Sequence, residues 1–218
     1  MSYAAVPASV ATILRDIHHW PLPARTYLAG GTAVAIYLNH RVSVDIDLFT
    51  GEEFYCGPII SSIEQRHAIT VTNAAERNTL LANVDNIKFS LFHYPYPLVK
   101  PLSANRDYNI KLASPEDIAA MKTVAIVQRG IAKDFVDLRA LMSSFKISLG
   151  DLIAAIHRKY KVSEEYTYQV KKSLVYFDDA ENSLGDVTIV TEGQKMRLDR
   201  KGWDEVKEFF NGIVFEGG

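Results

Sequence analysis

Two acidic residues, Asp45 and Asp47, are the best candidates for catalysis in this sequence. They lie in the segment Val44-Asp45-Ile46-Asp47-Leu48-Phe49, whose alternation of apolar and acidic residues predicts a β-strand. Both carboxylates then point to one face, about 7 Å apart at their Cα atoms. A divalent cation such as Mg²⁺ (or Mn²⁺) binds one or two carboxylates together with phosphate oxygens, so the pair is a candidate metal site. The alternative is an exposed strand whose acids only face solvent.

A glycine pair precedes these acids. A short strand is predicted over 26–29 and an apolar helix over 32–39. Gly30 and Gly31 lie between them, directly before Thr32, the first residue of the predicted helix. Glycine permits close backbone approach, and a helix N-terminus offers free N–H groups to a phosphate. We therefore predict that this turn binds a nucleotide, although it matches neither a Rossmann nor a Walker pattern and is otherwise an ordinary turn.

The residues between these two motifs extend the candidate site. The stretch from Gly30 to Asp47 spans 18 residues and includes Arg41 and Ser43, so a phosphate cradle and metal ligands come to the same end of a sheet. Arg41 and Ser43 are predicted nucleotide-binding residues. For Arg41, a structural salt bridge at a corner of the chain is an equal alternative.

A second group of charged residues follows in a predicted helical region. Lys122 and Arg129 are seven residues apart and so share a helix face, and Asp134 and Asp137 lie on the next predicted helix. We predict that Lys122 donates to a polyphosphate, oriented by Asp134 or Asp137, and that Arg129 and Asp134 belong to the nucleotide site. The alternative places Lys122 at an interface between two lobes, with its stem buried.

Hydrophobic periodicity predicts an α/β first half and a helical second half, divided near residue 110 into lobes of 1–110 and 111–218. The further predicted elements are helices over 7–19, 58–66, 115–129, 133–144, 150–160, 164–177 and 202–212, a strand over 69–72, and a hairpin of 80–84 and 87–93 turned at Asp85-Asn86. Ser114 and Pro115 favour a helix start, and Gly130 favours its end.

Composition excludes several classes. The chain of 218 residues is 48% hydrophobic and 23% charged, with a net charge of -2 and a single cysteine, which indicates a globular protein without internal disulfides. The histidines form no zinc-binding pattern. Neither a signal peptide nor an apolar run of about 20 residues is evident. We therefore expect a cytoplasmic protein with no membrane association.

The combined motifs resemble the AbiEii/AbiGii family of nucleotidyltransferase toxins, which belong to the polymerase-β-like superfamily. The segments that carry the resemblance are Gly30-Gly31-Thr32-Ala33, Arg41-x-Ser43-x-Asp45-Ile46-Asp47-Leu48-Phe49, Tyr94-Pro95-Tyr96-Pro97-Leu98, Lys111-Leu112-Ala113-Ser114, Asp117-Ile118-Ala119-Ala120-Met121-Lys122, Lys133-Asp134-Phe135-x-Asp137-Leu138 and Tyr176-Phe177-Asp178-Asp179-Ala180 with Trp203.

The resemblance implies a polymerase-β-like lobe with a mixed sheet, followed by a helical lobe. It also implies a metal-dependent nucleotidyltransferase that acts as the toxin of a toxin–antitoxin or phage-defence system. The expected partners are an NTP substrate, an RNA acceptor (tRNA in some relatives) and a cognate antitoxin protein. The expected catalytic residues are Asp45, Asp47, Lys122 and Asp137.

The sequence departs from the superfamily at one point. Many polymerase-β-like enzymes carry a third carboxylate on a neighbouring strand, but residues 86–93 contain no acid. Asp134, Asp137 or Asp85 is the expected substitute, and His93 at the strand end is a weaker candidate for substrate contact. Two alternatives therefore stay open: a silent module that binds a nucleotide or a partner without turnover, and a metal-dependent glycosyltransferase that uses the same Asp-x-Asp pattern.

Overall fold

The computed structural model describes residues 4–216 and contains a mixed seven-stranded sheet in the order β3-β4-β5-β2-β1-β7-β6. Its strands are β1 (Tyr27–Leu28), β2 (Ile46–Thr50), β3 (Ile69–Ala74), β4 (Thr79–Val84), β5 (Ile87–His93), β6 (Ser103–Asn105) and β7 (Ile110–Leu112). β2 pairs with β5 and β1 with β7 in parallel, and the other neighbours are antiparallel. The predicted mixed α/β fold is confirmed.

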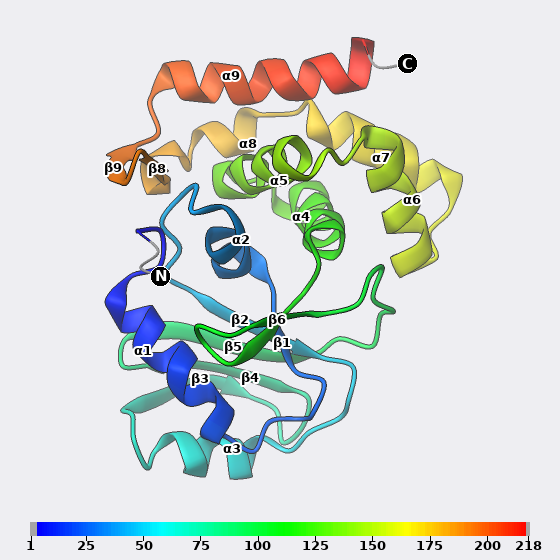
Figure 1. The fold of residues 1–218 in the computed structure, drawn as a ribbon. Coiled ribbons are helices and arrows are strands. Elements are labelled where there is room, and N and C mark those ends of the chain that lie inside the picture. Colours follow the sequence, from blue (N-terminus) through cyan, green and yellow to red (C-terminus); the bar gives the residue numbers. More distant parts are fainter. Residues whose placement is uncertain (1–3, 217–218) are drawn as a thin grey trace.

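Helices cover both faces of this sheet (Figure 1). On one side lie α1 (Ala8–Asp16) and α3 (Cys56–Ile63), and on the other α2 (Gly30–Leu38), α4 (Pro115–Arg129) and α5 (Ala132–Phe145). An outer layer follows, made of α6 (Leu149–Tyr160), α7 (Glu164–Leu174), α8 (Asp178–Glu181) and α9 (Arg200–Asn211). Short helical turns complete the chain at Ile17–His19, Leu184–Asp186 and Gly212–Glu216.

Local signals set the ends of α4 as predicted. Ser114 Oγ accepts a hydrogen bond from the backbone N–H of Asp117, and Pro115 occupies the first helical position. Gly130 ends the helix with a φ of 53°. The hairpin turn is also confirmed, since Asp85 and Asn86 both have the positive φ angles that a tight two-residue turn requires.

A second, two-stranded sheet from the C-terminal part of the chain is hydrogen-bonded to the segment that precedes Asp45. The hairpin of β8 (Thr188–Thr191) and β9 (Gln194–Arg197) was not predicted. The N–H of Val42 donates to the carbonyl of Thr188 at 2.8 Å, and the N–H of Val190 donates to the carbonyl of His40 at 2.8 Å. The segment that leads into Asp45 is therefore held by residues from the far end of the chain.

Several predicted boundaries were wrong. The sheet continues through β7 to Leu112, so the second half is helical only after that strand and contains the β8–β9 hairpin as well. α7 stops at Leu174, before the predicted end at 177. Buried apolar residues form one continuous core through both halves, and the division into lobes of 1–110 and 111–218 stays a prediction.

No single helix among residues 4–216 is long and apolar enough to cross a membrane. α5 and α6 reach that length and composition only as a pair, with a bend of 112° between them.

Candidate functional site

Asp45 and Asp47 line one cavity of about 260 Å³ whose floor is the surface of β4 and β5. Asp47 lies within β2, whereas Asp45 lies one residue before that strand. The prediction that Asp45 is a strand residue was therefore wrong, and the preceding Val44 is 50% exposed. The two carboxylates nevertheless face the same space and are both partly exposed.

The glycine pair packs the start of α2 against the acids. Gly30 and Gly31 were predicted to form a turn before the helix, but they are its first two residues. Gly30 has a φ of 65°, and a Cβ atom on it would lie 2.6 Å from Asp47 Oδ2. A Cβ atom on Gly31 would collide with the guanidinium of Arg41 and lie 2.9 Å from Ser43 Oγ. Only glycine permits this approach.

The N-terminus of α2 has no side-chain cap, because its N-cap residue is Ala29. The N–H groups of the first helical turn have no partner within the helix and carry its positive dipole end. The first residue of this turn, Gly30, lies directly against the Asp47 carboxylate. This geometry suits the nucleotide-binding role predicted for Gly30 and Gly31.

Thr32 and Ser43 hold the backbone that precedes the strand. Thr32 is 1% exposed, its hydroxyl donates to the carbonyl of Asp45, and its oxygen lies 2.9 Å from Ser43 Oγ. Thr32 therefore positions Asp45 from within the protein. Ser43 also lines the larger cavity described next.

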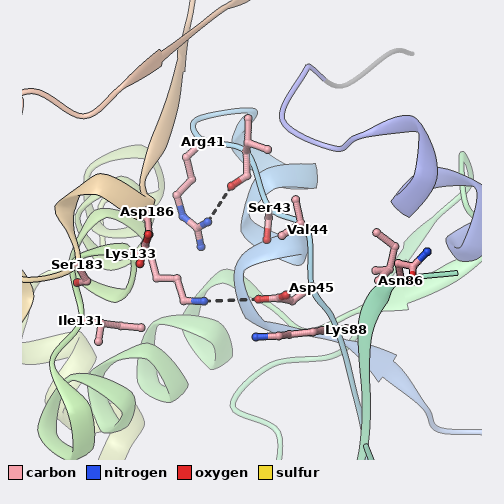
Figure 2. Close-up of a pocket in the computed structure, with 12 residues that line it drawn as sticks. Arg41, Ser43, Val44, Asp45, Asn86, Lys88, Ile131, Lys133, Ser183 and Asp186 are labelled. Atoms are coloured by element: carbon pink, nitrogen blue, oxygen red, sulfur yellow. Dashed lines mark hydrogen bonds and ion pairs between the residues drawn. The ribbon is translucent and has the colours of Figure 1, made fainter. Parts of the chain in front are cut away.

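A second cavity of about 450 Å³ also includes Asp45 in its lining (Figure 2). It is lined by Arg41, Val42, Ser43, Val44, Asp45, Asn86, Ile87, Lys88, Ile131, Lys133, Ser183 and Asp186. Lys133, from α5, approaches Asp45 across this cavity, with its Nζ 3.5 Å from Asp45 Oδ2. Asp45 belongs to both cavities and lies where they meet.

Arg41 does not point its charge at an open phosphate site. It is 5% exposed, and its Nε and Nη2 each donate a 2.6 Å hydrogen bond to the two carboxylate oxygens of Asp137. The phosphate-binding prediction for Arg41 is corrected to its alternative, the structural salt bridge, because a bidentate buried pair uses the donors that a phosphate would need.

Asp137 is fully buried at the centre of this ion network. His40 Nε2 and Lys122 Nζ also lie 2.7 Å from its oxygens. Burial disfavours its charged form, but Arg41 and Lys122 hold the pKa of its carboxyl well below the ordinary value. Asp137 lines neither cavity beside Asp45, and its carboxylate is paired inside the protein, so the structure shows a structural role for it, and a catalytic role stays a prediction.

Lys122 belongs to the same network. It is 6% exposed and lies 2.9 Å from Asp134 Oδ1. Although burial opposes the charged form, Asp137 and Asp134 raise the pKa of Lys122. Lys122 lines neither cavity beside Asp45, and its ammonium group is paired with Asp134 and Asp137 inside the protein, so a contact of Lys122 with a polyphosphate stays a prediction.

Arg129 reaches Asp134 from the same face of α4 as Lys122. Its Nε lies 2.9 Å from Asp134 Oδ2 and its Nη2 lies 3.2 Å from Oδ1. The shared helix face inferred from the seven-residue spacing is confirmed. Asp134 is fully buried, whereas the Arg129 side chain is 55% exposed, so only Arg129 of these two retains access to a ligand.

Ser90 lies beside Asp47 on β5, the neighbouring strand on which a third carboxylate was expected. The two residues are partners in the parallel pairing of β2 and β5, and Ser90 Oγ donates a 2.6 Å hydrogen bond to Asp47 Oδ1. The carboxylate of Asp85, another expected substitute for the third acid, is instead paired with His67, whose Nδ1 lies 2.7 Å from Asp85 Oδ2. His93 lines neither cavity. Within residues 4–216 no group of three or more acidic, histidine or cysteine side chains is arranged to hold a metal ion.

Comparison with known proteins identifies the family. The family described as "Nucleotidyl transferase AbiEii toxin, Type IV TA system" matches residues 12–88 and 87–213. The chain belongs to the AbiEii family. It is also 38% identical over 192 residues to an uncharacterised protein of Aquifex aeolicus (strain VF5), covering 87% of this chain and 86% of that protein.

Among solved structures, the fold of this AbiEii chain resembles MenT4, a nucleotidyltransferase toxin from Mycobacterium tuberculosis H37Rv. The TM-score is 0.58 at 13% sequence identity, and the match covers 94% of this chain and 81% of that one. At this identity the similarity shows a shared fold.

The AbiEii chain offers a metal ion two carboxylates, from Asp45 and Asp47. Mg²⁺ keeps several waters and takes one or two carboxylates together with substrate phosphates, so this donor set fits it. Thr32 fixes the backbone of Asp45, and Ser90 fixes one oxygen of Asp47. The sequence indicated the two acids but not Lys88 as a site residue, because an exposed strand lysine carries no distinguishing pattern.

Proposed function

We propose that this AbiEii-family chain transfers a nucleotide from an NTP to a hydroxyl group of an acceptor, with Mg²⁺ or Mn²⁺ held by Asp45 and Asp47. The observation that carries the proposal is the placement of these acids beside two cavities that both include Asp45 in their lining, with the uncapped start of α2 against Asp47 and Lys133 against Asp45. Two cavities that share Asp45 in their lining suit a reaction between two substrates.

In the proposed reaction the acceptor oxygen forms a bond to the α-phosphorus as the bond to the β-phosphate oxygen breaks. Pyrophosphate leaves, and the hydroxyl proton passes to solvent. The bound divalent ion would polarise the phosphoryl oxygens and neutralise charge on the leaving group. The N–H groups at the start of α2 bind phosphate oxygens, and Lys133 and the exposed side of Arg129 add positive charge.

The proposed acceptor is RNA, with tRNA as the first candidate. Although the chain has a net charge of -2, Lys88 and Lys133 line the larger cavity and Arg129 is half-exposed nearby. A local positive region of this kind can bind a polyanion on a protein that is acidic overall. The family description supports the further proposal that a cognate antitoxin restrains the activity in the cell.

The decisive experiment incubates the purified protein with each α-labelled NTP, Mg²⁺ and total RNA. We expect label in RNA, and a loss of at least about 100-fold in Asp45→Asn or Asp47→Asn, since electrostatic stabilisation of the transition state is removed. Asp179→Asn, which changes an exposed acid on α8, is the matched control and keeps full transfer. Undiminished transfer by Asp45→Asn contradicts the proposal.

A binding function without turnover is favoured by one observation, the hydrogen-bonded Ser90 in place of a third acid. The same experiment separates the two functions when paired with calorimetry. Binding of Mg²⁺-NTP without labelled product or pyrophosphate from any NTP would support the silent module.

A further inference from the structure

Two residues, Asp45 and Lys88, line both of the cavities described above. Together with Ser90, Lys88 lines the smaller cavity over β4 and β5, and with Asn86 and Ile87 it closes the larger one. A group bound in either cavity therefore lies near both the Lys88 side chain and Asp45.

The strand register places Lys88 beside the acids. Ile46 pairs with Phe89 and Asp47 pairs with Ser90 in the parallel ladder of β2 and β5. Because strand side chains alternate, Phe89 points into the core while Lys88 and Ser90 share the face of Asp47. In Figure 2 the Lys88 ammonium group extends from β5 toward Asp45, opposite Lys133.

The charge of Lys88 is not used by the fold. The side chain is exposed, and it forms no ion pair within the described part of the chain. Lys133, by comparison, already lies 3.5 Å from Asp45, and the buried cations Arg41 and Lys122 are paired with Asp137. Lys88 is thus the available cation on the sheet side of the junction.

We propose that Lys88 binds a phosphate group at the junction of the two cavities, next to the ion held by Asp45 and Asp47. A lysine ammonium binds phosphate oxygens by charge-assisted hydrogen bonds. The phosphate belongs either to the NTP or to the backbone of a nucleic-acid acceptor. The inference rests on the proposed function for its biological meaning, but phosphate binding can be measured without turnover.

The test measures binding with Lys88→Ala, Lys88→Glu and Lys88→Arg. The probes are the four NTPs with a methylene group between the α and β phosphorus atoms, and a short single-stranded RNA, each with Mg²⁺ and again with EDTA. Lys111→Ala is the matched control, because Lys111 is an exposed lysine on strand β7 of the same sheet.

We expect Lys88→Ala to weaken binding of one probe by about tenfold or more and Lys88→Glu to weaken it further. Lys88→Arg and Lys111→Ala stay within about threefold of the wild type. Loss confined to the NTP analogues assigns the phosphate to the nucleotide, and loss confined to RNA assigns it to the acceptor. The loss persists in EDTA, since the contact is made by the lysine itself.

Unchanged binding of both probes by folded Lys88→Ala overturns the inference, as does a wild type that binds neither probe. These outcomes differ from failure of the proposed function. If labelled transfer is absent while Lys88→Ala weakens binding, the phosphate-binding role of Lys88 is supported and the proposed transfer reaction is not. If transfer requires Asp45 but Lys88→Ala binds normally, only the role of Lys88 is lost.

Discussion

Ser90 Oγ donates a 2.6 Å hydrogen bond to Asp47 Oδ1 across the parallel strands β2 and β5. This bond holds the carboxylate of one proposed metal ligand and occupies one of its lone pairs. In the proposed enzyme Ser90 acts as a positioning residue, since the Asp47 carboxylate would otherwise rotate.

Removing this hydroxyl should slow the reaction more than it weakens substrate binding. For Ser90→Ala we expect kcat to fall by about tenfold with KM nearly unchanged. A loss of this size is expected because the variant lacks a hydrogen bond, worth about 1 kcal/mol, that orients the Asp47 carboxylate. Ser90→Thr, which keeps a hydroxyl, restores most of the rate. Steady-state kinetics of labelled transfer measure both, and an unchanged kcat in Ser90→Ala would show that Asp47 needs no orienting bond.

Replacing Gly30 by alanine should disturb both the fold and the proposed metal site. The new Cβ would lie 2.6 Å from Asp47 Oδ2, and the φ of 65° is strained for alanine. We expect a loss of about 1–3 kcal/mol in unfolding free energy and weaker Mn²⁺ binding, measured by urea unfolding and by electron paramagnetic resonance titration.

Gly57→Ala is the control for that substitution. Gly57 lies in α3, and a Cβ atom added to it would meet no other atom within 4 Å, so alanine should stabilise the helix by about 0.5–1 kcal/mol. Normal Mn²⁺ binding by Gly30→Ala would show that the close approach to Asp47 has no role in the site.

The buried ion network should be essential for stability. Asp137→Asn removes the charged partner of the buried Arg41 and leaves the buried Lys122 with Asp134 as its one remaining counter-ion in the described part of the chain. We expect a loss of about 3–5 kcal/mol in unfolding free energy, measured by urea titration. Asp204→Asn breaks a more exposed pair with Lys207 and should cost at most about 1 kcal/mol. Equal costs for the two variants would contradict the assignment.

The same network predicts how stability depends on pH. Asp137 and Asp134 have a lower pKa in the folded state, so their stabilisation is complete above the unfolded pKa of about 3.9 and is lost as the pH falls toward the folded value. The pKa of Lys122 is raised in the folded state, so its contribution to the free energy of unfolding is complete below about pH 10. This contribution is lost only as the pH rises further.

The network therefore contributes a constant stabilisation between about pH 5 and 9. The difference in unfolding free energy between wild type and Asp137→Asn should be flat over this range and shrink below about pH 4. Urea titrations across this series test it, and a difference that grows on acidification would mean that Asp137 is protonated in the native state.

Local features of the fold were predictable from the sequence. Ser114, Pro115 and Gly130 act on groups within a few residues, so the ends of α4 follow from residue type alone. The turn at Asp85 and Asn86 is local in the same way. The alternation around Ile46 likewise placed Asp45 and Asp47 in one space.

The roles of the charged residues were decided only by the tertiary structure. The sequence named Arg41, Lys122 and Asp137 as site residues, but the partner of Arg41 lies 96 positions away. Whether an ion faces a ligand or another ion depends on packing between distant segments, and sequence spacing carries no information about it. Lys88 is the opposite case, because the sequence did not mark it as a site residue. The pairing of β5 with β2 places it beside the two acids. The sequence determined which local elements form and which chemistry is available, while long-range packing decided which charges stabilise the fold and which face the cavities.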